Sequence, residues 1–222
     1  MIATQKDNRE EMFPLVDEEG NIIGAATRGE CHNGSKCLHP VVHLHVFNSR
    51  GELYLQKRPH WKDIQPGRWD TAVGGHVDLG ESVEMALRRE AEEELGLTGF
   101  TPERLPYYVF ESDRERELVF PHRCTYDGEI RPSAETDGGR FWSTTEIHEA
   151  MGKGIFTPNF ESEYNLPGAS LSFFLLTSVT TASAALYSAQ SASALASSSF
   201  VNFFFEFSST TCPFVSACER SA

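Results

Sequence analysis

The chain has 222 residues, 40% of them hydrophobic, which is enough for one domain of ordinary size with a buried core. Its formal net charge of −13 argues against a protein that coats nucleic acid through a basic surface, but not against an enzyme that meets phosphate through a metal ion. Residues 1–12 contain no apolar run of a secretory signal, and the five cysteines are irregularly spaced. We therefore expect a cytoplasmic protein with reduced thiols, whose partners include neither nucleic acid nor a membrane.

Two β-hairpins are predicted after a polar, flexible segment at residues 1–11. In each of them apolar runs flank a polar turn, which is the pattern of paired antiparallel strands. The predicted strand pairs are 13–16 with 22–26 and 41–47 with 53–57. His43 and His45 alternate with apolar residues, so both are expected to line one face of a sheet.

A short strand at 71–73 and a helix at 81–95 are predicted next. Apolar residues repeat every four positions along this helix and predict a buried stripe, formed by Val83, Leu87, Ala91 and Leu95. The later predicted elements are strands at 107–111 and 118–126, a strand ending at 141–142, and a helix at 144–151 capped by Ser143. Because hairpins alternate with helices, the predicted fold class is α/β, with a mixed sheet between helices.

The face of the 81–95 helix opposite the apolar stripe is acidic. Glu90, Glu93 and Glu94 are spaced i, i+3, i+4 and therefore share this face. Three crowded carboxylates repel one another, and a hard divalent cation such as Mg²⁺, which prefers oxygen ligands, would relieve the repulsion. The alternative interpretation is a solvated acidic helix with intrahelical ion pairs.

The spacing around this helix resembles the signature of the Nudix hydrolases, G-x5-E-x7-R-E-U-x-E-E-x-G-U, in which U is apolar. The matching residues are Gly75, Glu81, Arg89, Glu90, Ala91, Glu93, Glu94, Gly96 and Leu97. The resemblance implies an α/β/α sandwich over residues 12–166. It also implies an enzyme in which water, with Mg²⁺ or Mn²⁺, cleaves a diphosphate bond in a nucleoside-diphosphate-linked or related substrate.

The resemblance also implies roles for the matching residues. Glu90 and Glu94 correspond to the main metal ligands, and Glu93 to a further ligand or the general base. Glu81 and Arg89 correspond to a supporting ion pair that orients the loop and the helix.

Further candidates lie at the ends of the signature and outside it. Gly75 would let its backbone carbonyl approach the metal, since it has no side chain, and Gly96 would end the helix in a left-handed conformation. Lys57 and Arg58, at a strand end, are candidates for substrate phosphate contacts. Glu135 lies where the family often has a glutamate that serves as an additional ligand or base.

Residues 13–80 resemble the isopentenyl-diphosphate-isomerase-like branch of the family, in segments such as LHPVVHLHVF and QPGRWDTAVGGHV. The isomerase holds a metal ion with three histidines and two glutamates. The residues that match this set are His32, His39, His76, Glu115 and Glu117. A second metal site is therefore implied, while the plainer interpretation places these side chains on exposed loops and an exposed strand.

Two departures from the isomerase favour hydrolysis over isomerisation. The isomerase has a catalytic cysteine two residues before its third histidine, whereas this chain has Gly74, which has no side chain to move a proton. The isomerase also lacks glutamates that hydrolysis needs, and here they are present.

A catalytically weak Nudix domain that binds a nucleotide as a sensor is the remaining alternative. The substrate, the general base (Glu93, Glu115, Glu117 or Glu135) and a homodimer, as in many relatives, stay open.

The composition changes from Pro167 onward, where 56 residues carry only three charged side chains. A membrane span near residues 171–186 is one interpretation, although serine and threonine weaken it. A low-complexity disordered segment is a second. We favour a third, translation in a shifted reading frame, because no surface-helix charge pattern follows Leu166.

Overall fold

The computed structural model describes residues 8–62, 65–166 and 171. The Ser/Ala/Phe-rich tail with its three interpretations lies outside the described residues, apart from Leu171. The described residues all belong to one compact unit. Within these ranges, no helix has the length and apolar character needed to cross a membrane.

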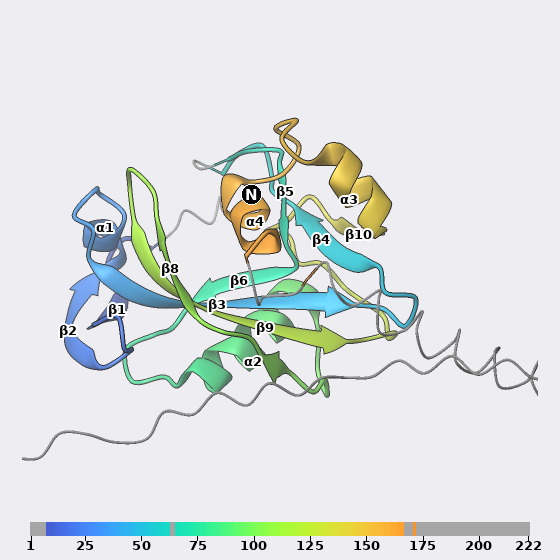
Figure 1. Ribbon diagram of the computed structural model, residues 1–222. Helices are drawn as coiled ribbons and strands as arrows, with labels where there is room; N and C mark the ends of the chain where they lie inside the picture. Colours follow the sequence, from blue (N-terminus) through green and yellow to red (C-terminus); the bar gives the residue numbers. More distant parts are fainter. Residues whose placement is uncertain (1–7, 63–64, 167–170, 172–222) are drawn as a thin grey trace, which may run out of the picture. The chain divides into compact units, whose positions relative to one another are not determined.

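The strands form two sheets (Figure 1). The smaller sheet is the antiparallel pair β1 (Met12–Val16) and β2 (Ile22–Thr27). The larger one contains β3 (Leu38–Phe47), β4 (Leu53–Lys57), β5 (Trp69–Thr71), β6 (Val73–His76), β7 (Glu103–Arg104), β8 (Tyr108–Glu111), β9 (Arg116–Thr125) and β10 (Gly139–Trp142). The described helices are α1 (Arg28–Cys31), α2 (Val83–Leu95), α3 (Thr144–Ala150) and α4 (Pro158–Tyr164).

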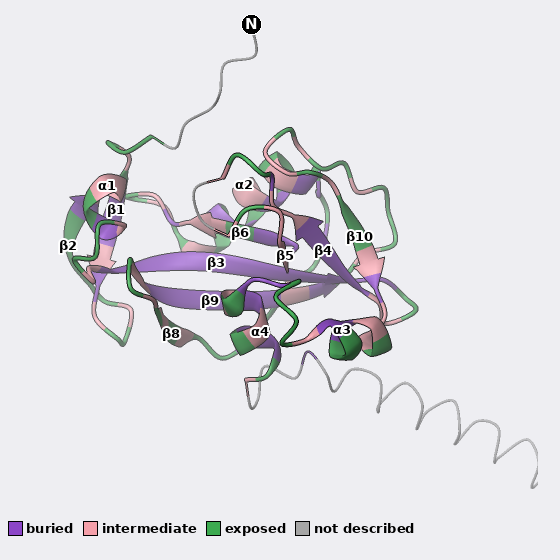
Figure 2. Ribbon diagram, turned by 90° about the horizontal axis from the view of Figure 1, so that it is seen from above, coloured by how far each residue is buried: buried purple, intermediate pink, exposed green. Residues whose placement is uncertain are grey.

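Strand β3 is the centre of the larger sheet, whose order is β10-β4-β3-β9-β7. It runs parallel to β9, and this pairing sets His39 opposite Glu117. Its other edge pairs with β6 over Val41–Leu44 and with β4 at Val46 and Phe47. All ten residues of β3 are buried, so polar side chains on this strand must find partners inside the protein (Figure 2).

Helices cover both faces of this sheet (Figure 1). On one face α2 packs against β3 through one core cluster, whose members include Val42, Leu44, Val46, Leu87, Ala91 and Leu95. On the other face a second cluster joins α3 and α4 to β4 and β10, with members that include Leu53, Leu55, Trp142, Ile147, Phe156 and Phe160. The α/β/α sandwich with a mixed sheet is therefore confirmed.

The two predicted hairpins and the predicted Nudix helix are present, with small shifts at their ends. Ser82 caps α2, and Gly96 ends it with a positive φ of 63°. The single strand expected at 71–73 is instead two strands, because the chain leaves β4 at Ala72 and then pairs with β3. Helix α4 was not predicted, and its sequence signals are the N-cap Thr157 followed by Pro158 in the first turn.

Candidate active site

The carboxylates of α2 lie against the edge of β6. Glu94 accepts hydrogen bonds at Oε2 from the Gly74 backbone N–H (3.2 Å) and from Gln56 Nε2 (3.3 Å). Burial raises the pKa of Glu94 to about 8, and the nearby charge of Glu90 adds to this effect. The pKa of Glu90 is also raised, chiefly by burial, although the guanidinium of Arg89 opposes the shift.

Arg89 connects the helix to the loop that precedes it. Its Nε and Nη2 donate to both carboxylate oxygens of Glu81, at 3.0 and 2.9 Å, which is a bidentate pair. Its Nη1 donates to Glu90 (2.7 Å) and to Glu93 (3.2 Å). Nη2 also donates to the His76 backbone carbonyl at 3.1 Å and lies 3.9 Å from Asp78 Oδ2. One side chain therefore fixes Glu81 and Glu90 relative to β6.

Gly75 is required by the position of Glu90. A Cβ added at Gly75 would lie 2.0 Å from Glu90 Cδ and 2.3 Å from its Oε1. No side chain fits there, so the absence of one lets the carboxylate rest directly on the β6 backbone. We call Gly75, Glu81, Arg89, Glu90, Glu93 and Glu94 the acidic site.

The acidic site has the donor set that a hard divalent cation requires. Glu90 and Glu94 place carboxylate oxygens at one backbone edge, where the charge of Glu90 raises the pKa of Glu94. A cation between them would remove this repulsion, and Mg²⁺ and Mn²⁺ favour oxygen ligands. The residues present therefore fit the metal that the signature implies.

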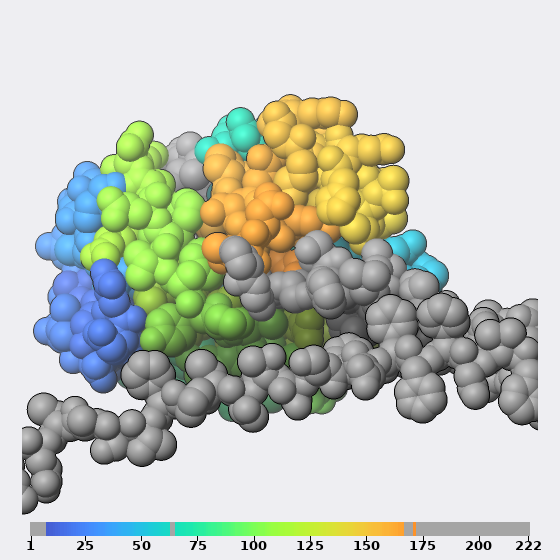
Figure 3. Space-filling model, in the orientation of Figure 1, coloured from blue at the N-terminus to red at the C-terminus, as the bar shows by residue number. Residues whose placement is uncertain are grey.

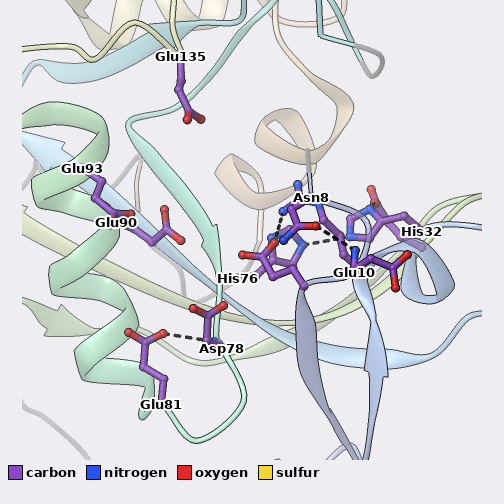
Figure 4. Close-up of polar contacts among 12 residues, drawn as sticks. Asn8, Glu10, His32, His76, Asp78, Glu81, Glu90, Glu93 and Glu135 are labelled. Atoms are coloured by element: carbon purple, nitrogen blue, oxygen red, sulfur yellow. Dashed lines mark hydrogen bonds and ion pairs between the residues drawn. The ribbon is translucent and has the colours of Figure 1, made fainter. Parts of the chain in front are cut away.

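Two further carboxylates face this position. The Glu93 side chain is 61% exposed, and it extends from α2 beside Glu90 (Figure 4). Glu135 points toward the same space from the opposite side, and its charge contributes to the raised pKa of Glu94. Lys62 lies 3.8 Å from the Glu135 carboxylate.

The two basic candidates at the end of β4 lie differently. Arg58 Nη1 forms an ion pair with Asp70 Oδ2 at 3.1 Å. Lys57 is held by its backbone, whose N–H donates to the Gly138 carbonyl. The structure thus brings Glu135 to the acidic site, whereas Arg58 is directed to Asp70.

The second predicted set of ligands also comes together. One ring nitrogen each from His32, His39 and His76 lies within 4.8 Å of the others. His32 Nε2 is 3.0 Å from His76 Nε2, and His32 Nδ1 is 2.9 Å from Glu115 Oε2. With Glu117, these residues form what we call the histidine site.

The electrostatics of the histidine site suit a metal ion. Burial lowers the pKa of His39 to about 4 and that of His76 well below its ordinary value, so both rings stay neutral, as metal ligands must. His39 Nε2 is buried without a hydrogen-bond partner in the described part of the chain. Burial and the neighbouring Glu115 raise the pKa of Glu117 to about 8.

Phe13 holds the rings of the histidine site in place. Its ring stacks on His76, with centroids 4.3 Å apart and planes 4° apart, and on His39 at 5.6 Å. Phe13 is fully buried in β1, so the small sheet covers this end of the larger one. The resemblance to the isomerase pointed to the three histidines, but it did not indicate this contact.

A polar group that the sequence did not reveal lies on β3 and α4. Glu163 is fully buried, and its two carboxylate oxygens contact His43 Nδ1 (2.8 Å) and His45 Nε2 (3.2 Å). We call these three residues the His43 cluster. The alternation along 41–47 indicated that both histidines face one way, but a partner 120 positions later leaves no local signal.

The fold is an α/β/α sandwich whose acidic site gathers the carboxylates of α2 at strand β6. The chain belongs to the Nudix family, because the family's NUDIX domain model matches residues 38–160.

Three similar proteins illustrate this membership. An uncharacterized Nudix hydrolase of Nostoc sp. is 42% identical over 87 residues, covering 39% of this chain and 52% of that protein. An isopentenyl-diphosphate Δ-isomerase of Corynebacterium efficiens is 39% identical over 90 residues, covering 40% of this chain and 47% of the isomerase. The match thus spans about half the length of these relatives. The crystal structure of DR0079 from Deinococcus radiodurans shares the fold, with a TM-score of 0.58 and 24% identity over 66% of this chain and 92% of that one.

Proposed function

We propose that this protein is a metal-dependent hydrolase that cleaves the diphosphate bond of a nucleoside-diphosphate-linked or related small molecule. The observation that carries the proposal is the pair Glu90 and Glu94, set side by side on the edge of β6 with raised pKa values. Arg89 holds Glu90 in this position, and Gly75 leaves the space for it. The complete Nudix signature supports the same activity.

Each residue of the acidic site has a task in this proposal. Glu90 and Glu94 would hold Mg²⁺ or Mn²⁺, together with the Gly75 carbonyl. The bound cation would neutralise the charge that develops on the phosphate oxygens during attack by water. The bidentate pair of Glu81 and Arg89 keeps the loop and helix in register, so that the carboxylates stay where the substrate meets them.

The general base is a carboxylate that reaches water near this position. Glu93 supports such a role because its side chain is mostly exposed, and Glu135 does because it faces Glu94 from the opposite side. Glu115 and Glu117 belong to the histidine site, so they are the weaker candidates. We therefore propose Glu93 or Glu135 as the base.

A second candidate function is isomerisation of isopentenyl diphosphate, as in the isomerase relatives. The observation that favours it is the assembled histidine site, whose five side chains match the isomerase metal ligands. Gly74 argues against it, because no side chain stands where the isomerase has its cysteine. A nucleotide sensor of the same fold would keep the acidic site and lack turnover.

The test is metal-dependent cleavage, measured on the full chain with a panel of nucleoside diphosphate sugars, dinucleotides, nucleoside triphosphates and isopentenyl diphosphate. Glu94→Gln should abolish turnover, and Glu92→Gln is the matched control, because Glu92 is an exposed glutamate of the same helix. Cleavage that survives Glu94→Gln would contradict the proposal. NMR of the isopentenyl diphosphate sample separates hydrolysis from migration of the double bond. Ligand-dependent stabilisation without turnover would favour the sensor.

The cytoplasmic location and the homodimer remain predictions. Fractionation of cells that express the chain checks the first, and light scattering of the purified protein checks the second.

A further inference from the structure

The His43 cluster is a buried charged group that the proposed chemistry leaves without a task. His43 and His45 point from β3 to the face of the sheet that α4 covers, away from α2. Figure 3 shows α4 (orange) beside β8 (lime green) on this face, where Tyr108 Oη lies 3.5 Å from Asn159 Oδ1. A fully buried carboxylate is costly unless it is paired, so a group of this kind calls for an explanation.

Helix α4 is attached to the sheet at both ends, which fixes the position of Glu163. At the start of the helix, Thr157 Oγ1 donates to Asp70 Oδ1 (2.7 Å) and accepts from the Phe160 N–H (3.2 Å). In the last turn, Glu163 meets the two histidines. The carboxylate is therefore placed by a docked helix, with Oε2 in a hydrogen bond to His43 and Oε1 within ion-pair distance of His45.

The contact with Glu163 requires that Nδ1 of His43 carries a proton. An ionised carboxylate only accepts hydrogen bonds, so Nδ1 of His43 must be the donor in the 2.8 Å contact. The other nitrogen, Nε2, is then the one left to meet a ligand. Within the described residues it has no hydrogen-bond partner, and the side chain is 10% exposed.

The free edge of the His43 ring lies next to Gly74, the neighbour of Gly75 in the acidic site. His43 pairs with Gly74 across β3 and β6, and a Cβ at Gly74 would lie 3.5 Å from His43 Cδ2 and 3.7 Å from Nε2. Gly74 is exposed, and its N–H is the donor to Glu94. His43 and Glu94 therefore both contact one exposed glycine, which has no side chain to fill the space beside it.

We propose that His43 is a substrate-contacting residue, whose Nε2–H donates to a phosphate oxygen of a diphosphate bound at the acidic site. Glu163 is a positioning residue, which orients the ring and balances its charge. The inference rests on the proposed function and adds to it a specific contact for the anion, made from the side of the sheet opposite α2.

The charges around His43 agree with a donor at neutral pH. Burial disfavours the charged ring, but the carboxylate of Glu163 outweighs it, and with Glu117 and Asp70 it raises the pKa of His43 to about 9. The ring then offers a charge-assisted hydrogen bond, which is stronger than a neutral one.

The test measures binding of methylenediphosphonate, a diphosphate that cannot be hydrolysed, by calorimetry with Mg²⁺ and the full chain. His43→Asn keeps a donor at the Nδ1 position for Glu163 but removes Nε2, and it should weaken binding by roughly tenfold or more. His43→Gln places an amide near the Nε2 position and should recover part of the loss. His122→Gln is the matched control, because His122 is a buried histidine of β9 whose Nδ1 contacts the Phe120 carbonyl.

A second measurement begins with the wild-type protein, so its main outcome does not depend on a folded variant. Long-range ¹H–¹⁵N spectra of the wild-type protein should show His43 protonated at Nδ1, and its Nε2 signal should move when the probe is added. In Glu163→Gln the movement should become smaller, while the His122 signals stay unchanged.

The outcomes separate this inference from the proposed function. Probe binding that is the same in His43→Asn and wild type, or an Nε2 signal that ignores the probe, would overturn the role of His43 and leave the hydrolase intact. Binding that depends on His43 in a protein that cleaves no compound would support the contact and overturn the hydrolase. A wild-type protein that binds no probe would overturn both.

Discussion

Replacing Gly75 by alanine should disable the acidic site with little change elsewhere. The new Cβ would lie 2.0 Å from Glu90 Cδ, whereas real Cβ atoms essentially never come closer than 3.0 Å to another group, so the carboxylate must retreat by at least 1.0 Å. Displacement of a catalytic group by about 1 Å costs about 100-fold in rate. Glu90 also loses its fixed place beside Arg89 Nη1, so Mg²⁺ affinity should fall by roughly 10–100-fold.

Calorimetric titration with Mg²⁺ and the kcat/KM of a cleaved substrate measure these two losses. Gly74→Ala is the matched control for folding and metal affinity, because its Cβ would meet His43 Cδ2 at 3.5 Å, an ordinary contact on the same strand. It should retain Mg²⁺ affinity and melting temperature. Wild-type Mg²⁺ affinity in Gly75→Ala would refute the reasoning, since Glu90 would then not be the ligand that the glycine accommodates.

Three further predictions follow from the same contacts. In Arg89→Lys the lysine cannot form the bidentate pair with Glu81 while also contacting Glu90, so kcat/KM should fall by roughly 10–100-fold. An unchanged kcat/KM would contradict the supporting role of Arg89. His32→Gln should remove a Co²⁺ or Mn²⁺ site at the histidine site, while Mg²⁺ binding at the acidic site persists. The visible absorption of bound Co²⁺ reports the loss. Identical Co²⁺ spectra for the variant and the wild type would exclude the histidine site as a metal site. The folded-state pKa of His43 lies above the ordinary value of 6.5, so its pairing with Glu163 stabilises the fold fully below pH 6.5 and loses this contribution as the pH rises through about 9. The melting temperature should therefore fall between pH 7 and 9.5, by roughly 2–4 °C per kcal/mol lost, and this slope should flatten in Glu163→Gln; equal slopes in both proteins would refute the linkage.

The parts of the fold that were predicted are those coded by neighbouring residues. The four-residue repeat of Leu87, Ala91 and Leu95 predicts α2 and its buried side, and turn residues between apolar runs predict the hairpins. The residues of the acidic site were named from the Nudix resemblance, whose signature covers one helix with the loop and strand before it. The spacing alone could not show that Gly75 serves to admit the Glu90 side chain rather than only a close carbonyl.

The parts that were missed depend on residues that are distant in sequence. Helix α4 has only seven residues, too few for an apolar period to emerge above its Thr157 and Pro158 signals. The pairing of Glu163 with His43 needs the docked helix, and the stacking of Phe13 on His76 needs the small sheet in place. Side chains such as Glu117 were expected on an exposed strand, yet parallel pairing of β9 with β3 buries this one.

The position of these groups along the chain has a consequence for how the protein assembles. The acidic site uses residues 75–94, whose contacts close only short loops, so we expect them to form early. The histidine site joins Phe13 to Glu117, and the His43 cluster needs Glu163 from the last described helix. A chain in which α4 has yet to dock would therefore already carry its carboxylates in place, while the ring of His43 still lacks the partner that orients it. The acidic site would therefore be able to hold a cation before α4 docks. His43 would be able to contact the anion only after α4 has docked.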